Sequence, residues 1–377
     1  MAQSGDFCRC ISESNRNVNV EALFASHLSA PSSSILMEWS QTRLQFFVII
    51  GKYSGDLLVF TINQQYTKLE NIFNNPVTSV CCGKLRQNSD EIVAISATGQ
   101  IRSFDFPHID PESDELQKPL PLFEQLIQAN ICASYIGDLD GDGLYELLVS
   151  MTDRCVRTYR YVANHLAPLS KYEVPSHICG LAIGITNSGQ FCAFLTERRK
   201  NYVVKIFFGS NSCNILPQMT VSESSIQELI VPDRPVFLDL IGSLASRLRL
   251  ISAGLLVQFF VIVFYQSFYI GVVEDDSSVT LVNPGGDFIC AATVNLPNEM
   301  FIAMILDIYG NLLIYGWKEN EIPPTQPIAK AIVLPDADRI AALPSGDEHE
   351  ILLCVCTVYF KVVVYLIDLS SLLKDIT

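Results

Sequence analysis

The sequence is short of positive charge and of histidine. It has 25 lysine and arginine residues against 40 acidic residues, a net charge of −15, and only five histidines. Binding nucleic acid through its phosphates needs a basic surface that replaces counterions, and the densest basic cluster runs only from Arg198 to Lys200. The histidines lie outside the motifs of serine hydrolases and zinc proteases. The composition therefore argues against a nucleic-acid partner and against a histidine-centred catalytic site.

A secretion signal is also missing from the first residues, where no basic segment is followed by an apolar core. The 12 cysteines are scattered through apolar runs rather than spaced as a disulfide framework, which is typical of free, buried thiols. Both features lead us to expect a reducing, intracellular location. Cys8 and Cys10 would supply half of a zinc site, but no second pair of cysteines or histidines follows nearby, so we do not expect zinc.

What the sequence does contain is a repeat. Two apolar runs of four to six residues, rich in Val, Ile, Phe and Tyr and joined by a small polar turn, recur along the chain. Such pairs of runs indicate β-hairpins. The second run of six copies closes on an aromatic residue: Phe60, Phe104, Tyr159, Phe207, Tyr315 and Tyr365. The long gap between the fourth and fifth of these holds a degenerate copy, Tyr269–Val282, which makes seven.

A period of about 50 residues with three or four strands per copy is the signature of a β-propeller. One such sheet cannot bury both of its faces, whereas packing around a closed ring buries them and protects the edges. We therefore predict an all-β, seven-bladed β-propeller (WD40-like), with residues 1–377 as a single domain. A two-sheet sandwich is the main alternative, but it does not explain near-constant spacing. The first blade should take a strand near Ser34–Trp39, and an early strand should pair with a late one to close the ring.

Two segments interrupt the pattern. Residues 108–121 are polar and without apolar period, and we expect an exposed loop there. Leu250–Val273 carries no charge and is long enough to span a bilayer. It lies inside the repeat array, however, and Gln258 and Gln266 interrupt it. We predict that 248–266 is an insertion in the fifth blade that arose from a retained intron. Genuine buried strands and a membrane segment are the alternatives.

One loop carries recognisable chemistry, the segment Asp138–Glu146 in the third copy. Three aspartates alternate over five residues, a glycine follows, and a glutamate stands at position nine. Ca²⁺ prefers six to eight oxygen ligands, and alternate side chains of a tight loop can converge on one ion. The predicted ligands are the carboxylates of four residues and one backbone carbonyl: Asp138, Asp140, Asp142, Glu146 and Leu144.

The loop differs from the helical calcium loop of EF-hands. That loop needs a bidentate glutamate at position twelve, where this sequence has Val149, and its flanks are helices, whereas the flanks here are expected strands. The alternative to a metal site is a polar turn whose aspartates accept backbone amides. Both interpretations stay open from the residues alone.

The same residues carry a family resemblance. The Asp-Leu-Asp-Gly-Asp-Gly loop, followed by Leu147–Val149, is similar to the FG-GAP repeat of integrin-α propellers. With Thr152–Arg154 and Val156–Arg157, the stretch Asn130–Tyr161 resembles the integrin-alpha FG-GAP repeat-containing protein 2 family. The resemblance implies at most one structural Ca²⁺, because the loops at 187–189, 295–299 and 345–350 have lost the motif.

The family resemblance also implies a function. It predicts a non-enzymatic scaffold subunit of a KICSTOR-like complex, with the other subunits and, through them, the GATOR complex as partners. Such a subunit would recruit GATOR to lysosomes and restrain mTOR kinase complex signalling on nutrient deprivation. It would be cytoplasmic and recruited to the lysosomal surface, with the nucleus as a second location and no membrane span. The alternatives are an adhesive propeller like that of integrin-α and, less favoured, a propeller glycosidase or lyase.

Overall fold

The structure is a computed structural model. It describes residues 18–28, 32–40, 43–61, 66–70, 72–107, 120–174, 177–185, 191–197, 202–208, 226–230, 237–241, 259–263, 268–272, 275–282, 287–296, 300–318, 321 and 324–373.

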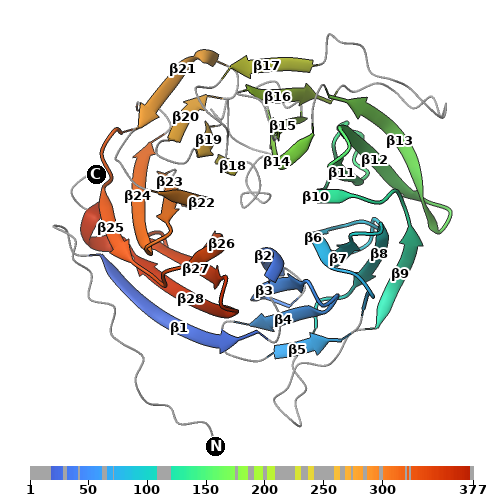
Figure 1. The fold of residues 1–377 in the computed structure, drawn as a ribbon, viewed down its shortest axis with the longest axis horizontal. Coiled ribbons are helices and arrows are strands. Elements are labelled where there is room, and N and C mark those ends of the chain that lie inside the picture. The colour runs from blue at the N-terminus through green and yellow to red at the C-terminus, as the bar shows by residue number, and fades with distance from the viewer. Residues whose placement is uncertain are drawn as a thin grey trace, which may run out of the picture.

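The described residues form seven four-stranded antiparallel sheets arranged around a ring (Figure 1). In six sheets the strand nearest the centre of the ring is also the earliest along the chain, and in the seventh the innermost strand is β26 while the early strand β1 is outermost. The innermost strands are β2 (Ser32–Ser40), β6 (Val77–Gly83), β10 (Ile131–Gly137), β14 (Ile178–Ile185), β18 (Phe237–Ile241), β22 (Phe288–Asn295) and β26 (Ala337–Pro344). The all-β propeller predicted from the repeat is therefore confirmed.

The other strands follow outward in the same order in each sheet. The second strands are β3 (Gln45–Lys52), β7 (Glu91–Ser96), β11 (Glu146–Met151), β15 (Phe191–Glu197), β19 (Phe259–Val263), β23 (Met300–Asp307) and β27 (Glu350–Thr357). The third strands are β4 (Leu57–Thr61), β8 (Gln100–Phe104), β12 (Cys155–Val162), β16 (Tyr202–Phe207), β20 (Phe268–Val272), β24 (Asn311–Lys318) and β28 (Lys361–Asp368). The outer strands are β5 (Tyr66–Leu69), β9 (Pro121–Leu126), β13 (His165–Glu173), β17 (Ile226–Ile230), β21 (Asp275–Val282), β25 (Ala329–Ile332) and β1 (Asn19–His27). A short helix, α1 (Ser370–Leu373), follows β28.

The ring closes within one sheet. β1, from the start of the described chain, pairs antiparallel with β28, from its end, over Asn19↔Asp368 to His27↔Lys361. The next strand along the chain, β2, then begins the first sheet, at the position expected near Ser34–Trp39. The predicted pairing of an early with a late strand is confirmed.

The apolar core lies between neighbouring sheets. On β11 the side chain of Leu147 packs with Val93 and Ile95 of the second sheet, while its neighbour Leu148 packs with Leu195 of the fourth. Successive residues of a strand point to opposite faces, so a fully apolar second strand serves two interfaces at once. This is why the central strands of the repeat lack the polar alternation of a half-exposed sheet.

The fifth sheet corrects one detail of the repeat. In the other six sheets the predicted hairpin is the pair of second and third strands, but Tyr269–Val282 lies on β20 and β21, the third and fourth. The second strand is β19, which pairs with both β18 and β20. The sequence assignment was shifted by one strand because the connection between β19 and β20, residues 264–267, begins with Phe and Tyr and does not read as a polar turn.

The two interrupting segments are only partly described. Of the predicted loop 108–121, residues 108–119 lie outside the described residues, and Pro121 already belongs to β9. Of the predicted insertion 248–266, Phe259–Val263 is β19 and the rest lies outside the described residues, so the intron origin stays a prediction. Within the described part of the chain, no helix combines the length and apolar character needed to cross a bilayer.

Candidate functional site

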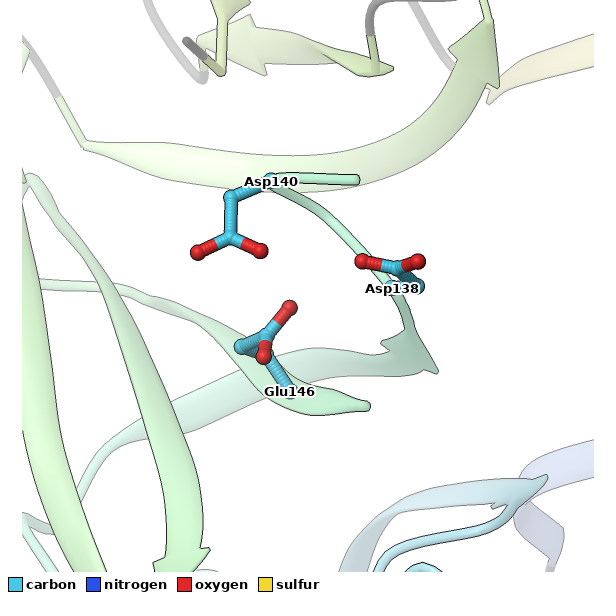
Figure 2. A group of neighbouring side chains, drawn as sticks. All are labelled: Asp138, Asp140 and Glu146. Carbon is cyan, nitrogen blue, oxygen red and sulfur yellow. The ribbon is translucent and has the colours of Figure 1, made fainter. Parts of the chain in front are cut away.

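The acidic loop connects the innermost and second strands of the third sheet. Asp138 follows β10 directly, and Glu146 is the first residue of β11. Gly141 and Gly143 take positive φ values of 77° and 88°, which a residue with a side chain rarely adopts. The carboxylates of Asp138, Asp140 and Glu146 point toward one another (Figure 2), and one ligand atom from each lies within 4.8 Å of the others.

The loop is closed by hydrogen bonds from its own backbone. Both oxygens of Asp138 accept amides, from Gly141 at 2.8 Å and from Gly143 at 2.9 Å. Asp140 accepts the Asp142 amide at 3.3 Å, and Asp142 accepts the Leu144 amide at 2.8 Å. The capping arrangement left open by the sequence is therefore present in the described loop.

A basic residue that the sequence interpretation missed lies among the carboxylates. Arg160 stands on β12 directly opposite Glu146 in the register. Its Nε donates to Glu146 Oε1 at 2.7 Å, and its other two nitrogens contact Asp140 at 3.1 Å and Asp142 at 2.8 Å. A tight turn at 152–154 fixes this register. The pairing of Arg160 with Glu146 could therefore have been derived from the hairpin pattern of the third copy.

Burial controls the electrostatics of this group. Glu146 is 2% exposed and Arg160 7%. Loss of hydration raises the pKa of Glu146 to about 7, although the Leu139 amide and Arg160 oppose the shift. Burial likewise raises the pKa of Asp140, while the surrounding carboxylates raise the pKa of the Arg160 guanidinium against its own desolvation. The guanidinium thus keeps its charge and is the cation of the cluster.

The carboxylates of the loop lie close enough together to bind one Ca²⁺, but several of their oxygens are already bound by Arg160. Two ligands of one Ca²⁺ lie at most about 5 Å apart, which the 4.8 Å group satisfies. One oxygen each of Asp140, Asp142 and Glu146 is already bound by Arg160, whose charge has the same sign as the ion's. With Arg160 in this position the residues do not fit the ion, and calcium binding by Asp138, Asp140, Asp142, Leu144 and Glu146 stays a prediction.

The acidic loop is also joined to the second sheet. The side-chain amide of Gln87, in the connection between β6 and β7, accepts the Tyr145 amide at 2.8 Å and donates to the Tyr145 carbonyl at 2.9 Å. Lys84 Nζ lies 5.8 Å from the centre of the Tyr145 ring. Two loops that are distant in sequence are therefore joined by direct contacts. No sequence signal identified this contact.

The other sequence candidates do not gather at this site. The described thiols are free, and Cys290, Cys354 and Cys356 are buried as expected. Cys8 and Cys10 lie outside the described residues. Among the described residues, the group Asp138, Asp140 and Glu146 is the only cluster of three or more acidic, histidine or cysteine side chains close enough to share a metal.

Comparison with known proteins supports the family resemblance of the acidic loop. Residues 69–228, which include the whole acidic loop, match the family described as integrin-alpha FG-GAP repeat-containing protein 2. The resemblance predicted from the loop is confirmed over this segment. A mouse relative named KICSTOR complex protein ITFG2 is 31% identical over 148 residues, or 37% of this chain and 31% of the relative. The bovine protein of that name is 32% identical over 124 residues, or 30% of this chain and 23% of the relative. The chain thus spans less than a third of either relative in these matches.

Solved structures support the fold across nearly the whole chain. BBS1N, in a crystal structure with ARL6DN, has a TM-score of 0.64 at 9% identity, covering 93% of this chain and 97% of that one. The Cps50 (Swd1) β-propeller domain of Myceliophteria thermophila has a TM-score of 0.54 at 10% identity, covering 93% and 99%. At these identities the likeness establishes the propeller fold alone.

Proposed function

We propose that this chain is a non-enzymatic scaffold subunit of a KICSTOR-like complex. The observation that carries the proposal is the match of residues 69–228 to the FG-GAP repeat-containing protein 2 family, together with relatives named as KICSTOR complex proteins. In this role the propeller recruits the GATOR complex to the lysosomal surface and restrains mTOR kinase complex signalling when nutrients are scarce. A propeller suits a scaffold because its ring presents many connecting turns to partners.

One face of the ring supports a protein contact. The turns between second and third strands expose apolar side chains on three neighbouring sheets: Tyr309 on the sixth, Val358, Tyr359 and Phe360 on the seventh, and Tyr53 on the first. Tyr359 is 67% exposed and Tyr309 64%. Backbone hydrogen bonds from Asp336 to Ile308 and from Val358 to Asp336 tie the sixth and seventh turns together. We call Tyr53, Tyr309 and Val358–Phe360 the aromatic turns.

The same face is polar over the second and third sheets. There the equivalent turns carry Thr98 and Thr152–Arg154, which are exposed. Clustered aromatic side chains are enriched in protein interfaces and often supply most of the binding free energy. We therefore assign the aromatic turns to contact with another subunit of the complex.

Affinity purification of the tagged full chain from starved cells tests the proposal. The wild type should recover the other KICSTOR subunits, and the triple substitution Tyr53→Ser, Tyr309→Ser, Tyr359→Ser should recover much less at an unchanged thermal unfolding temperature. The matched control is Thr98→Ser with Thr152→Ser on the polar turns, which should recover as much as the wild type. If the wild type recovers no subunit from cells whose complex is otherwise intact, the scaffold role is wrong. Surface glycosylation would instead favour the adhesive propeller, and activity in a hydrolase screen would favour an enzyme.

A further inference from the structure

Each carboxylate oxygen of the acidic loop has a nitrogen partner from the protein itself, in a hydrogen bond or an ion pair. Its four carboxylates have eight oxygens; seven accept an N–H in the described structure, and the eighth, Asp142 Oδ2, forms an ion pair with Arg160 Nη1 at 2.8 Å. Backbone amides bind both oxygens of Asp138 and one oxygen each of Asp140, Asp142 and Glu146. Arg160 binds the remaining oxygen of Asp140, Asp142 and Glu146.

The geometry of the guanidinium explains how one side chain serves three carboxylates. Arginine carries five N–H donors in a planar fork, and Arg160 uses all three of its nitrogens. Its position follows from the hairpin, because β11 and β12 pair Glu146 with Arg160. A Ca²⁺ bound to the same oxygens would lie close to a permanently charged group of like sign, in a site where burial strengthens the repulsion.

The neighbouring sheet uses a related arrangement without the alternating aspartates. Glu91 is the first residue of β7, as Glu146 is of β11, and its side chain is fully buried. Arg86 donates to it at 2.7 Å. A buried glutamate at this position paired with an arginine is therefore a feature of this chain rather than of the acidic loop alone.

We propose that the guanidinium of Arg160 occupies the position a calcium ion would take in the acidic loop, so that the loop is held closed without a divalent ion. Calcium and the guanidinium are then alternative occupants of one position. The proposal concerns the loop itself and does not depend on the scaffold role.

The test compares thermal unfolding and Tb³⁺ luminescence of the full chain in EDTA and in millimolar Ca²⁺. We expect the wild type to show the same unfolding temperature in both and no Tb³⁺ signal. Arg160→Gln removes the charge, and it should unfold at a lower temperature in EDTA, regain part of the loss with Ca²⁺ and gain a Tb³⁺ signal that Ca²⁺ displaces. Arg160→Lys keeps the charge and should not respond to Ca²⁺.

Arg157→Gln is the matched control, since Arg157 lies on the same strand opposite Val149, away from the carboxylates. It should behave as the wild type toward both ions. Stabilisation of the wild type by Ca²⁺, or its binding of Tb³⁺ at the loop, would overturn the proposal. A folded Arg160→Gln variant that ignores both ions would also overturn it, because the guanidinium and the ion would then not share a position. If Arg160→Gln does not fold, the wild-type and Arg160→Lys measurements still decide.

Discussion

The connections before β7 and before β11 occupy the same place in adjacent sheets, and each ends on a buried glutamate. In the second sheet Glu91 receives its cation from Arg86 of the connection itself, at 2.7 Å. In the third sheet Glu146, on β11, receives it from Arg160 on the paired strand β12, and the same guanidinium also holds Asp140 and Asp142. Only the third connection has the alternating aspartates.

The difference shows that the buried glutamate–arginine pair and the alternating aspartates are two separate features of these connections. Both connections share a glutamate with no more than 2% exposure and an arginine that compensates its charge, because an unpaired buried charge is costly. The aspartates of the third loop are additional and more exposed, with 28% exposure of the Asp140 and Asp142 side chains. The third loop thus adds the alternating aspartates to a glutamate–arginine pair that the neighbouring sheet also has without them.

Removing the arginines should give the largest effect and break the comparison directly. Arg160→Met leaves three carboxylates without their cation, and we expect a loss of about 4 kcal/mol in the free energy of unfolding. Arg86→Met leaves only the Glu91 carboxylate without its cation. Because the Arg86 side chain is 23% exposed, the substitution should lower the free energy of unfolding by about 2 kcal/mol. Urea unfolding of the full chain at neutral pH measures both. Equal losses of unfolding free energy in the two variants would mean that the contacts of Arg160 with Asp140 and Asp142 do not stabilise the fold.

The link between the two connections should give a smaller effect. Gln87→Ala removes both hydrogen bonds to the Tyr145 backbone, and we expect a loss of about 1 kcal/mol. Hydrogen exchange of the amides of Gly141, Gly143 and Leu144 should also become faster, because the acidic loop loses its support from the second sheet.

The chain offers a matched control for this substitution. Gln125 makes the same pair of hydrogen bonds with the Leu166 backbone, at 2.7 and 3.1 Å, between the outer strands of the same two sheets. Gln125→Ala should cost a similar free energy of unfolding but leave exchange in the acidic loop unchanged. Faster loop exchange in both variants would show that the effect comes from general loosening of the interface between the sheets.

The sequence was sufficient for most of the fold because the repeat is local. Six hairpins follow from two apolar runs and a polar turn, and the closure by β1 follows from the need to leave no edge in the ring. The fifth sheet was misassigned because Leu250–Val273 is apolar throughout. A strand pattern needs polar turns to set its boundaries, and here Gln266 and Ser267 were interpreted as interruptions of one apolar run rather than as a boundary between two strands.

The site was only half predictable for a related reason. Alternating aspartates and glycines predict a tight acidic loop. Arg160 could have been found by counting the strand register outward from the turn at 152–154. The contact between Gln87 and Tyr145 could not, because it joins residues of different repeats and depends on how adjacent sheets are set around the ring. Periodicity fixes the strands within a sheet but carries no information on which loop residues meet between sheets.

The buried glutamate of the second connection should give the smallest effect, seen only as a dependence on pH. Burial raises the pKa of Glu91 above its usual value of 4.5; Arg86 opposes the shift and Asp105 adds to it. The folded state therefore keeps this proton to a higher pH than the unfolded state, and its contribution to stability is lost as pH rises from about 4.5 through the folded pKa. Glu91→Gln cannot lose a proton, so its stability relative to the wild type should increase over that range in urea unfolding between pH 4.5 and 7. Glu146, whose pKa is raised to about 7, titrates in both proteins and cancels in the difference. Parallel curves for the two proteins would show that Glu91 releases its proton as easily in the folded as in the unfolded chain, and that Arg86 compensates the burial of Glu91 completely.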